Sequence, residues 1–344
     1  MLIIGMDVHK DSTVMCLLNP QAPREHRFRH VTVATTREGL ESVLRPLAGQ
    51  CRVVFEVGAQ AQWVASIVRP LAAEVQVANP SRMPWLFRDG RKNDKLDARK
   101  LATLLHIDQV PSVYLPRAEV SIWRSLINFR RTQIKRRTMI KNQIRAMLRA
   151  EALRCPHKSL WTRSGQSWLR SLPFDAARKL MLRGLMAELA FVDGQRGSIE
   201  TQLDAMAQTQ PAIALLRTIP GIGPRSAEAI VAYTDRVDRF GNGKKFASYF
   251  GMTPTQDASG LVNRHGHISK RGPSVVRWVL VEAVHQVIRR CPVFGAFFAQ
   301  VVRGKPERRK RAVVATGRKL LTVAFAMLRD QSPFDPGRVR VAAA

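Results

Sequence analysis

The first hundred residues alternate between short apolar runs and segments with helical spacing, and this alternation constrains the fold more than any other feature. Apolar or alternating runs of about four to eight residues are typical of strands, whereas apolar residues three or four apart are typical of amphipathic helices. Strand-like runs fall at residues 2–9, 13–18, 30–36, 52–57 and 75–79. Helix-like segments fall at 36–48, 61–74 and 94–106. The predicted order is three strands, then alternating helices and strands, and a closing helix.

Three hairpin strands followed by alternating helices and strands predict an α/β sheet of the RNase H-like type. Because 344 residues exceed one ordinary domain, we expect three regions. The α/β domain takes residues 1–112, and a basic helical region takes residues 113–210. Residues 211–344 are expected to form a mainly α-helical domain, with helices at 274–290 and 310–328.

Basic residues outnumber acidic ones by 56 to 26, which gives a net charge of +30. Residues 1–112 contain 15 basic and 11 acidic residues, so the remainder, with 41 and 15, carries +26. Such a surplus repels itself in a compact fold unless a polyanion neutralises it, and nucleic acid is the commonest such partner. Charge predicts the partner and not the activity, because a ribosomal-type binding protein would also be basic.

The surplus is densest at residues 117–149, which hold ten Lys or Arg and the single acid Glu119. Apolar residues at helical spacing predict a long helix here, paired with a second over about 176–209 as a helical hairpin or coiled coil. Two interpretations stay open: a solvated basic face, or an arm that presents cations to phosphates. The residues that would contact phosphates are Arg130, Arg131, Lys135, Arg136 and Arg137.

Neither a membrane span nor a cysteine framework is expected. No apolar run approaches the ~20 residues that cross a bilayer, and Asp7 interrupts the segment where a secretory signal would be apolar. Four cysteines lie far apart without ligand spacing, which predicts scattered core thiols. We expect a cytoplasmic protein.

Four carboxylates form a pattern that suits metal-dependent chemistry. Asp7 lies inside the first strand-like run, where an acid costs burial energy, and Glu56 ends another such run. Asp94 and Asp97 stand three apart, on one face of a predicted helix. Singly, each is better explained as a strand-end or helix-start residue. Together they are what a nuclease of the RNase H-like type needs to hold two Mg²⁺ ions over a phosphodiester. A phosphate loop of an actin-like ATPase is the weaker alternative, because no further Gly-rich loops follow.

Two features of the C-terminal region concern nucleic acid. The sequence PGIGP at 220–224 resembles the turn of a helix-hairpin-helix, in which Gly221 and Gly223 let backbone amides approach a phosphate. Ser259 lies in a polar stretch with the pattern of a loop, and its residues alone favour an ordinary turn serine.

At this point the sequence resembles the DEDD transposases of the insertion-sequence 110 family. The motifs occur in the family's order: GMDVHKD, FEVGA, KNDKLDARKLA, IPGIG, FASYFGMTP, DASG and SKRGPSVVRWVL, followed by ATGRKLLTVAFAMLRDQSPFDP. They cover the chain from about residue 2 to residue 336. Each motif alone is weak, whereas seven in order are specific.

The resemblance implies a RuvC-like (RNase H-like) N-terminal domain, a coiled-coil middle and a C-terminal transposase domain. The family's acidic tetrad falls on Asp7, Glu56, Asp94 and Asp97, and its catalytic serine falls on Ser259. In this family DNA is cut and rejoined by the serine working with the metal site, and a structured RNA from the element can guide the pairing of target and donor DNA. Lys270 and Arg271 of the SKRGP motif are further expected DNA contacts.

The favoured hypothesis is a nucleoid-associated prokaryotic recombinase that acts through a phosphoserine intermediate with Mg²⁺ at the tetrad. Because recombination joins two duplexes, a homodimer or homotetramer is expected. Two alternatives remain: a nuclease of the Holliday-junction resolvase type that uses the same carboxylates with water, and a non-enzymatic nucleic-acid-binding protein.

Overall fold

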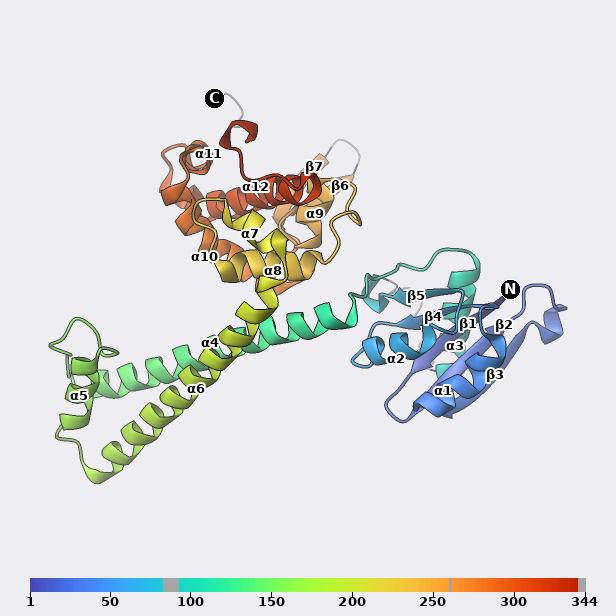
Figure 1. Ribbon diagram of the computed structural model, residues 1–344, viewed down its shortest axis with the longest axis horizontal. Coiled ribbons are helices and arrows are strands. Elements are labelled where there is room, and N and C mark those ends of the chain that lie inside the picture. The colour runs from blue at the N-terminus through green and yellow to red at the C-terminus, as the bar shows by residue number, and fades with distance from the viewer. Residues whose placement is uncertain (83–92, 260–261, 340–344) are drawn as a thin grey trace. The chain divides into compact units, whose positions relative to one another are not determined.

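The computed structural model describes residues 1–82, 93–259 and 262–339. The chain divides into two compact units, Met1–Ala118 and Glu119–Ala344, here called unit one and unit two (Figure 1). Unit one is a mixed α/β sheet with three α-helices, and unit two is mostly helical.

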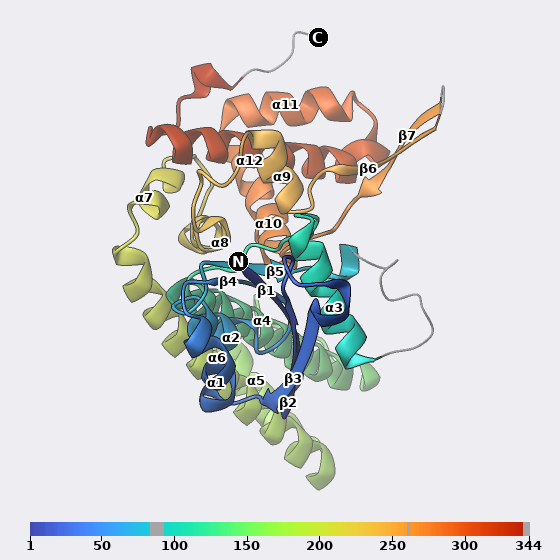
Figure 2. The ribbon, with the colours of Figure 1, turned by 90° about the vertical axis from the view of Figure 1, so that its right-hand side faces the viewer.

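Unit one contains a five-stranded sheet in the order β3-β2-β1-β4-β5 (Figure 2). The first three strands pair antiparallel, whereas β4 pairs parallel with both β1 and β5. The strands are β1 Leu2–Val8, β2 Ser12–Leu18, β3 Phe28–Ala34, β4 Cys51–Glu56 and β5 Glu74–Ala78. The predicted order of strands and helices is therefore confirmed.

Helices cover both faces of this sheet. Side chains alternate along each strand, so Ile4 and Phe55 face one side, where they pack with α1 (Arg37–Leu44) and α2 (Ala61–Val68). Ile3 and Val54 face the other side, against α3 (Asp94–His106). Short 3₁₀ turns lie at Arg24–His26, Arg45–Leu47 and Pro80–Arg82.

Gly5 fixes how closely α3 approaches the sheet. A Cβ atom at this position would lie 2.1 Å from the carbonyl oxygen of Ala98 and 2.5 Å from the amide nitrogen of Ala102, both in α3. Only a residue without a side chain fits, and the acids at the start of α3 are thereby held near the end of β1.

We expect Gly5→Ala to lower the free energy of unfolding by at least about 2 kcal/mol, because the added methyl must push the α3 backbone away. Urea unfolding followed by circular dichroism measures this. Gly58→Ala is the matched control, since a Cβ there meets nothing within 4 Å. Equal unfolding midpoints for the two variants would contradict the close approach.

Unit two begins with a helical arm formed by two antiparallel helices and a helix at their tip (Figure 1). The arm comprises α4 Ala118–Ala150, α5 Arg163–Ser171 and α6 Ala176–Gln208. Ile144, Leu169 and Leu189 belong to one buried cluster near the tip. At the other end, the Trp123 indole donates a hydrogen bond to the buried Glu228 carboxylate at 2.9 Å, which anchors α4 to the rest of the unit.

The remainder of unit two, here called the head, is a bundle of helices with one β-hairpin. The helices are α7 Pro211–Arg217, α8 Pro224–Thr234, α9 Gly243–Tyr249, α10 Ser274–Arg290, α11 Pro292–Val302 and α12 Arg309–Asp330, with 3₁₀ turns at Pro306–Arg308 and Pro336–Arg338. The hairpin consists of β6 Pro254–Ser259 and β7 Val262–Ile268. Among the described helices, none combines the length and the apolar character needed to cross a bilayer.

The hairpin corrects one expectation, because the stretch around Ser259 was predicted to be a loop. Among the described residues its two strands pair only with each other, and Thr255, Gln256 and Gly266 are exposed. A two-stranded ribbon that belongs to no larger sheet lacks the apolar alternation by which a strand is recognised in sequence.

Candidate functional site

Strand alternation places the predicted carboxylates on one side of the sheet. Asp7 shares the α3-facing side of β1 with Ile3 and Gly5, and Glu56 shares that side of β4 with Val54. Met6 pairs with Phe55 in the parallel register, so the two acids follow at the carboxyl ends of adjacent strands. The carboxyl edge of β1 and β4 is thus acidic on the side that α3 covers.

The N-terminus of α3 supplies the other two acids. Asn93 caps the helix by accepting a hydrogen bond from the Lys95 amide at 3.0 Å, and Asp94 and Asp97 lie in its first turn. Asp94 is about half exposed, with a side-chain exposure of 47%, whereas Asp97 is buried and its Oδ1 lies 3.9 Å from the Lys100 Nζ. The helix dipole favours negative charge at this end and supports the placement of both acids.

Asp7 and Asp94 meet around a histidine that the sequence analysis did not single out. His9 Nε2 lies 3.2 Å from Asp7 Oδ2 and 3.5 Å from Asp94 Oδ2. One ligand atom from each of the three side chains lies within 4.8 Å of the others, a spacing that could hold a metal ion. The sequence did contain one signal for His9. Because His9 lies two residues after Asp7, an extended chain places both side chains on the same side.

The electrostatics of this cluster favour a bound cation. Burial raises the pKa of the Asp7 carboxyl; His9 opposes that rise, and the nearby Asp94 and Asp97 add to it. Three carboxylates that repel one another near a partly buried position are stabilised when a positive charge enters. The donor set of carboxylate oxygens suits a hard divalent cation.

Glu56 stands slightly apart from this group. The metal-competent set contains Asp7, His9 and Asp94 and does not include Glu56. Glu56 instead borders a hollow of about 410 Å³ together with His9 and the Gly58–Ala59 turn at the start of α2. His9 belongs to both, so the hollow and the acid cluster are neighbours at the same edge of the sheet.

Ser259 lies in the other unit. It is the last residue of β6 and pairs across the hairpin with Val262. Its side chain, like that of the neighbouring His265, lies outside the described part of the structure, as do residues 260–261. Ser259 is thus placed at the tip of a projecting hairpin.

The five basic residues proposed for α4 divide into two kinds. Arg130 and Arg137 form ion pairs with acids of α6, Glu200 and Asp193, each at 2.6 Å. Arg131 donates to the Ser274 hydroxyl at 2.8 Å. Lys135 and Arg136 are exposed, and of the five they are the pair that can meet a phosphate without breaking a contact between described residues.

We expect Lys135→Glu combined with Arg136→Glu to reduce the salt dependence of DNA binding. Each phosphate contact contributes about 0.9 to the slope of log K against log salt, so the slope should fall by up to about two. Fluorescence anisotropy over a range of salt concentrations measures it, with Arg289→Glu and Arg290→Glu on α10 as the charge-matched control. Equal slopes for the two double variants would assign α4 a solvated basic face.

The predicted glycine turn is explained in part by packing. Gly221 has a φ of +98°, and a Cβ there would lie 2.7 Å from the Val287 amide nitrogen in α10. Gly223 is the extended N-cap of α8. Lys270 and Arg271, which follow β7, are both exposed. That these four residues contact nucleic acid stays a prediction.

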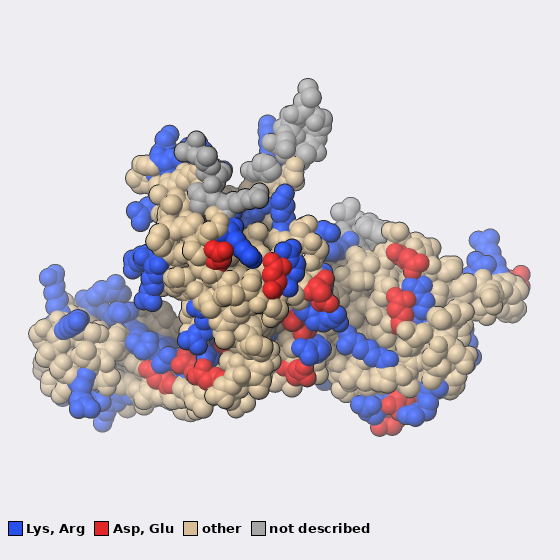
Figure 3. Space-filling view, turned by 45° about the horizontal axis from the view of Figure 1, so that its top comes forward, with Lys and Arg blue, Asp and Glu red and all other residues tan. Residues whose placement is uncertain are grey.

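Basic side chains are spread widely over the surface, and most acidic side chains in view have basic neighbours (Figure 3). This agrees with the excess of 41 basic over 15 acidic residues after position 112. The surface carries the positive potential expected of a protein that binds a polyanion.

Comparison with protein families identifies related sequences. A model of the IS110-type DEDD transposases matches residues 4–151, and a model described as the transposase IS116/IS110/IS902 family matches residues 213–299. The first match spans the carboxylate cluster and α4, and the second spans the glycine turn, the hairpin and α10.

Curated relatives match over most of the chain. A probable family 20 transposase of Pseudomonas aeruginosa is 27% identical over 328 residues, which cover 90% of this chain and 94% of the relative. The transposase for insertion sequence element IS1111A of Coxiella burnetii is 24% identical over 97% of this chain and 92% of its own length. A pilin gene-inverting protein of Moraxella lacunata is 32% identical over 123 residues, 35% of this chain and 38% of that protein.

Proposed function

The chain belongs to the IS116/IS110/IS902 family of transposases, and from this we propose that it is a site-specific DNA recombinase that works through a covalent phosphoserine intermediate. The observation that carries the proposal is the convergence of Asp7, His9 and Asp94 at the end of β1, in the unit that matches the DEDD transposases. Strand order and the covering helix α3 support an RNase H-like (RuvC-like) assignment for this unit.

The carboxylates of Asp7, Glu56, Asp94 and Asp97 would hold Mg²⁺, two ions in the full site. Hard oxygen donors and the mutual repulsion of the acids around Asp7 fit such a cation. When bound, such a cation would activate the attacking oxygen and stabilise the leaving one. His9 holds the Asp7 and Asp94 carboxylates toward each other through contacts of 3.2 and 3.5 Å.

The serine performs the covalent step. The Ser259 hydroxyl oxygen attacks a phosphodiester, a P–Oγ bond forms, and the bond from phosphorus to one sugar oxygen breaks, so that this oxygen leaves with a proton as a free hydroxyl. A hydroxyl of the second DNA strand then attacks the phosphoserine, which restores the serine and joins the strands. Each step exchanges one phosphodiester bond for another, so the reaction needs no external source of energy.

Three further features belong to the proposal. Because two duplexes must be joined, the recombinase acts as a dimer or tetramer on donor and target DNA. A structured RNA encoded by the element guides their pairing. We also retain three regions, with boundaries after residues 112 and 210: the α/β domain, the helical region that contains α4 and α6, and the transposase domain.

A plasmid that carries the gene with its native flanking DNA tests the function. We expect cells that contain it to form rejoined junctions between the element ends, detectable by sequencing across the junction, and these should vanish with Asp94→Asn. Linear products with free ends and without junctions would favour a nuclease of the resolvase type. Intact DNA in every sample would favour a nucleic-acid-binding protein.

A further inference from the structure

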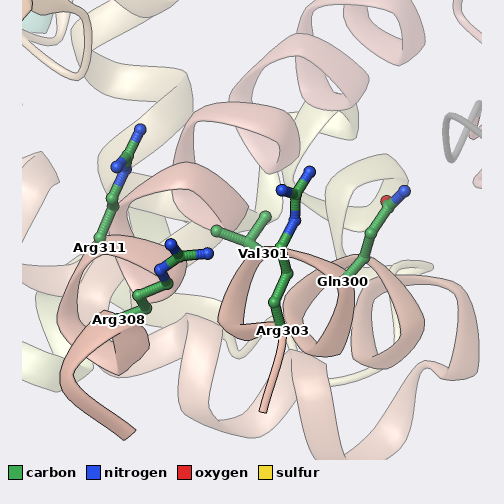
Figure 4. A pocket seen from close by; sticks show the side chains of 5 residues that line it. All are labelled: Gln300, Val301, Arg303, Arg308 and Arg311. Atoms are coloured by element: carbon green, nitrogen blue, oxygen red, sulfur yellow. The ribbon is translucent and has the colours of Figure 1, made fainter. Parts of the chain in front are cut away.

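A basic hollow lies where α11 turns into α12. The α11 helix ends at Val302, and Arg303 and Gly304 both adopt left-handed backbone conformations, with φ of 50° and 69°. The 3₁₀ turn Pro306–Arg308 then leads into α12. The hollow has a volume of about 320 Å³ and is lined by Gln300, Val301, Arg303, Arg308 and Arg311. Figure 4 shows the three arginine side chains on the same side of the turn.

These three arginines, here called the arginine corner, differ from Arg130 and Arg137 of the arm. Among the described residues, Arg303, Arg308 and Arg311 form no ion pair with an acid. Arg130 and Arg137, by contrast, each pair with a carboxylate at 2.6 Å. The lining of this hollow contains three guanidinium groups and no acid, and the exposed Glu307 lines the adjoining groove. A hollow lined in this way favours the entry of an anion, and the planar guanidinium matches the oxygens of a phosphate.

The arginine corner also adds positive charge near the N-terminus of α12, where the helix dipole already gives the backbone a partial positive charge. The first turn of α12 contains basic residues and no acid, and no side chain caps the helix. Cations near a helix N-terminus are unfavourable, by about 0.3–1 kcal/mol each in exposed positions. Arg311 is exposed, so hydrophobic packing does not offset this cost, whereas Arg303 is the C-cap of α11, a helix end that favours cations. The stability of α12 therefore does not account for Arg311 at this position.

A larger groove connects the arginine corner to the hairpin that carries Ser259. This groove has a volume of about 1120 Å³ and runs between α12 and the foot of the hairpin, where Ile268 and Lys270 line it. Arg311 lines both hollows. From Arg311 to Thr322, the α12 side of the groove extends about 16 Å, at a rise of about 1.5 Å per residue.

The groove combines cations with apolar surface, as a nucleic-acid strand requires. Lys310 and Arg318 contribute positive charge from α12, and Phe297 and Val314 contribute apolar surface. Glu307 is the one acid in the described lining. Phosphates are held by cations, and sugars and bases pack on apolar or aromatic side chains.

We propose that the arginine corner binds a backbone phosphate of the DNA strand on which the Ser259 hairpin acts, with the groove along α12 holding the nucleotides between them. The inference rests on the proposed function, because the proposed reaction of Ser259 with DNA is what identifies the bound strand as DNA. It adds a substrate-binding site, Arg303, Arg308 and Arg311, whose residues are distinct from those of the acid cluster and of the basic face of α4.

The test compares two triple variants of the full chain that remove the same charge. Arg303→Gln, Arg308→Gln and Arg311→Gln empty the arginine corner, and Arg217→Gln, Arg289→Gln and Arg290→Gln remove three exposed arginines elsewhere in the head. Binding of a duplex from the element end, and of RNA of the same sequence, is followed by fluorescence anisotropy against salt. We expect the DNA affinity of the corner variant to fall at least about tenfold, and its slope of log K against log salt to fall by about two to three. The slope of the control should fall by less than about one.

Equal DNA affinity and slope in the two variants would overturn the proposal, and so would a loss confined to RNA. The thermal midpoint of the corner variant should equal or exceed that of the wild type, because like charges near the α12 N-terminus are removed. Should the triple variant unfold, Arg308→Gln alone should still lower the slope by about one. Since binding is measured without recombination, a failed junction assay would remove the proposed function and leave the DNA site standing.

Discussion

Replacing Asp94 with asparagine, or Asp7 with asparagine, is expected to lower strand exchange at least about a hundredfold while DNA binding is retained. Loss of outer partners of a metal site already costs about 10- to 100-fold, and these two side chains would be direct ligands. The structure places both within the group around His9, at the carboxyl edge of β1. Junction formation in Mg²⁺ by purified protein measures the loss, and anisotropy with the same duplex measures binding.

Glu38→Gln is the control for these variants, because it makes the same change of charge on the exposed start of α1, a helix on the opposite face of the sheet. It should recombine DNA like the wild type. Full junction formation by Asp94→Asn or Asp7→Asn would remove the carboxylates from the mechanism.

The second large effect is expected at Ser259. A serine hydroxyl is a poor nucleophile at neutral pH and must be activated by a base or a metal. Ser259→Ala should therefore eliminate both covalent protein–DNA adducts and strand exchange, while folding and DNA binding stay unchanged. Ser198→Ala on the exposed face of α6 is the control, since it removes a hydroxyl far along the chain from the hairpin. Strand exchange by Ser259→Ala would make water or another residue the nucleophile.

Mixing the two inactive proteins tests whether the acids and the serine of one site come from different subunits. Ser259 and the carboxylates belong to different units of the chain. If two subunits share each site, an equal mixture of Ser259→Ala and Asp94→Asn should recover activity at about a quarter of the sites in a two-fold dimer. If each chain completes its own site, the mixture should stay inactive.

Local patterns in the sequence predicted the elements of unit one because its core lies on defined faces. The helix predicted at 94–106 agrees with α3 in both bounds, since Asn93 caps its first turn and the acids suit its dipole. The helix predicted at 61–74 was too long: α2 ends at Val68, two residues before Pro70, which cannot continue a helix. The extended hairpin at Ser259 was missed because its strands do not alternate in polarity.

The sequence indicated the residues of the candidate acidic site, and only the structure showed its geometry. Alternation along β1 and β4 and the spacing of Asp94 and Asp97 indicated the four carboxylates. The sequence could not show that His9 lies between Asp7 and Asp94, because that contact depends on how closely α3 approaches Gly5. Nor could it separate Arg130 and Arg137, which pair within the arm, from the exposed Lys135 and Arg136.

The most direct test of the account is to identify the residue that becomes joined to DNA. Wild-type protein is incubated with a DNA duplex from the element end and Mg²⁺, the reaction is stopped with denaturant, and the DNA-linked peptide is sequenced by mass spectrometry after nuclease and protease digestion. The account predicts a nucleotide phosphate on Ser259 in the β6–β7 hairpin. Cleaved DNA with free ends and no linked peptide, or a link to another residue, would contradict it.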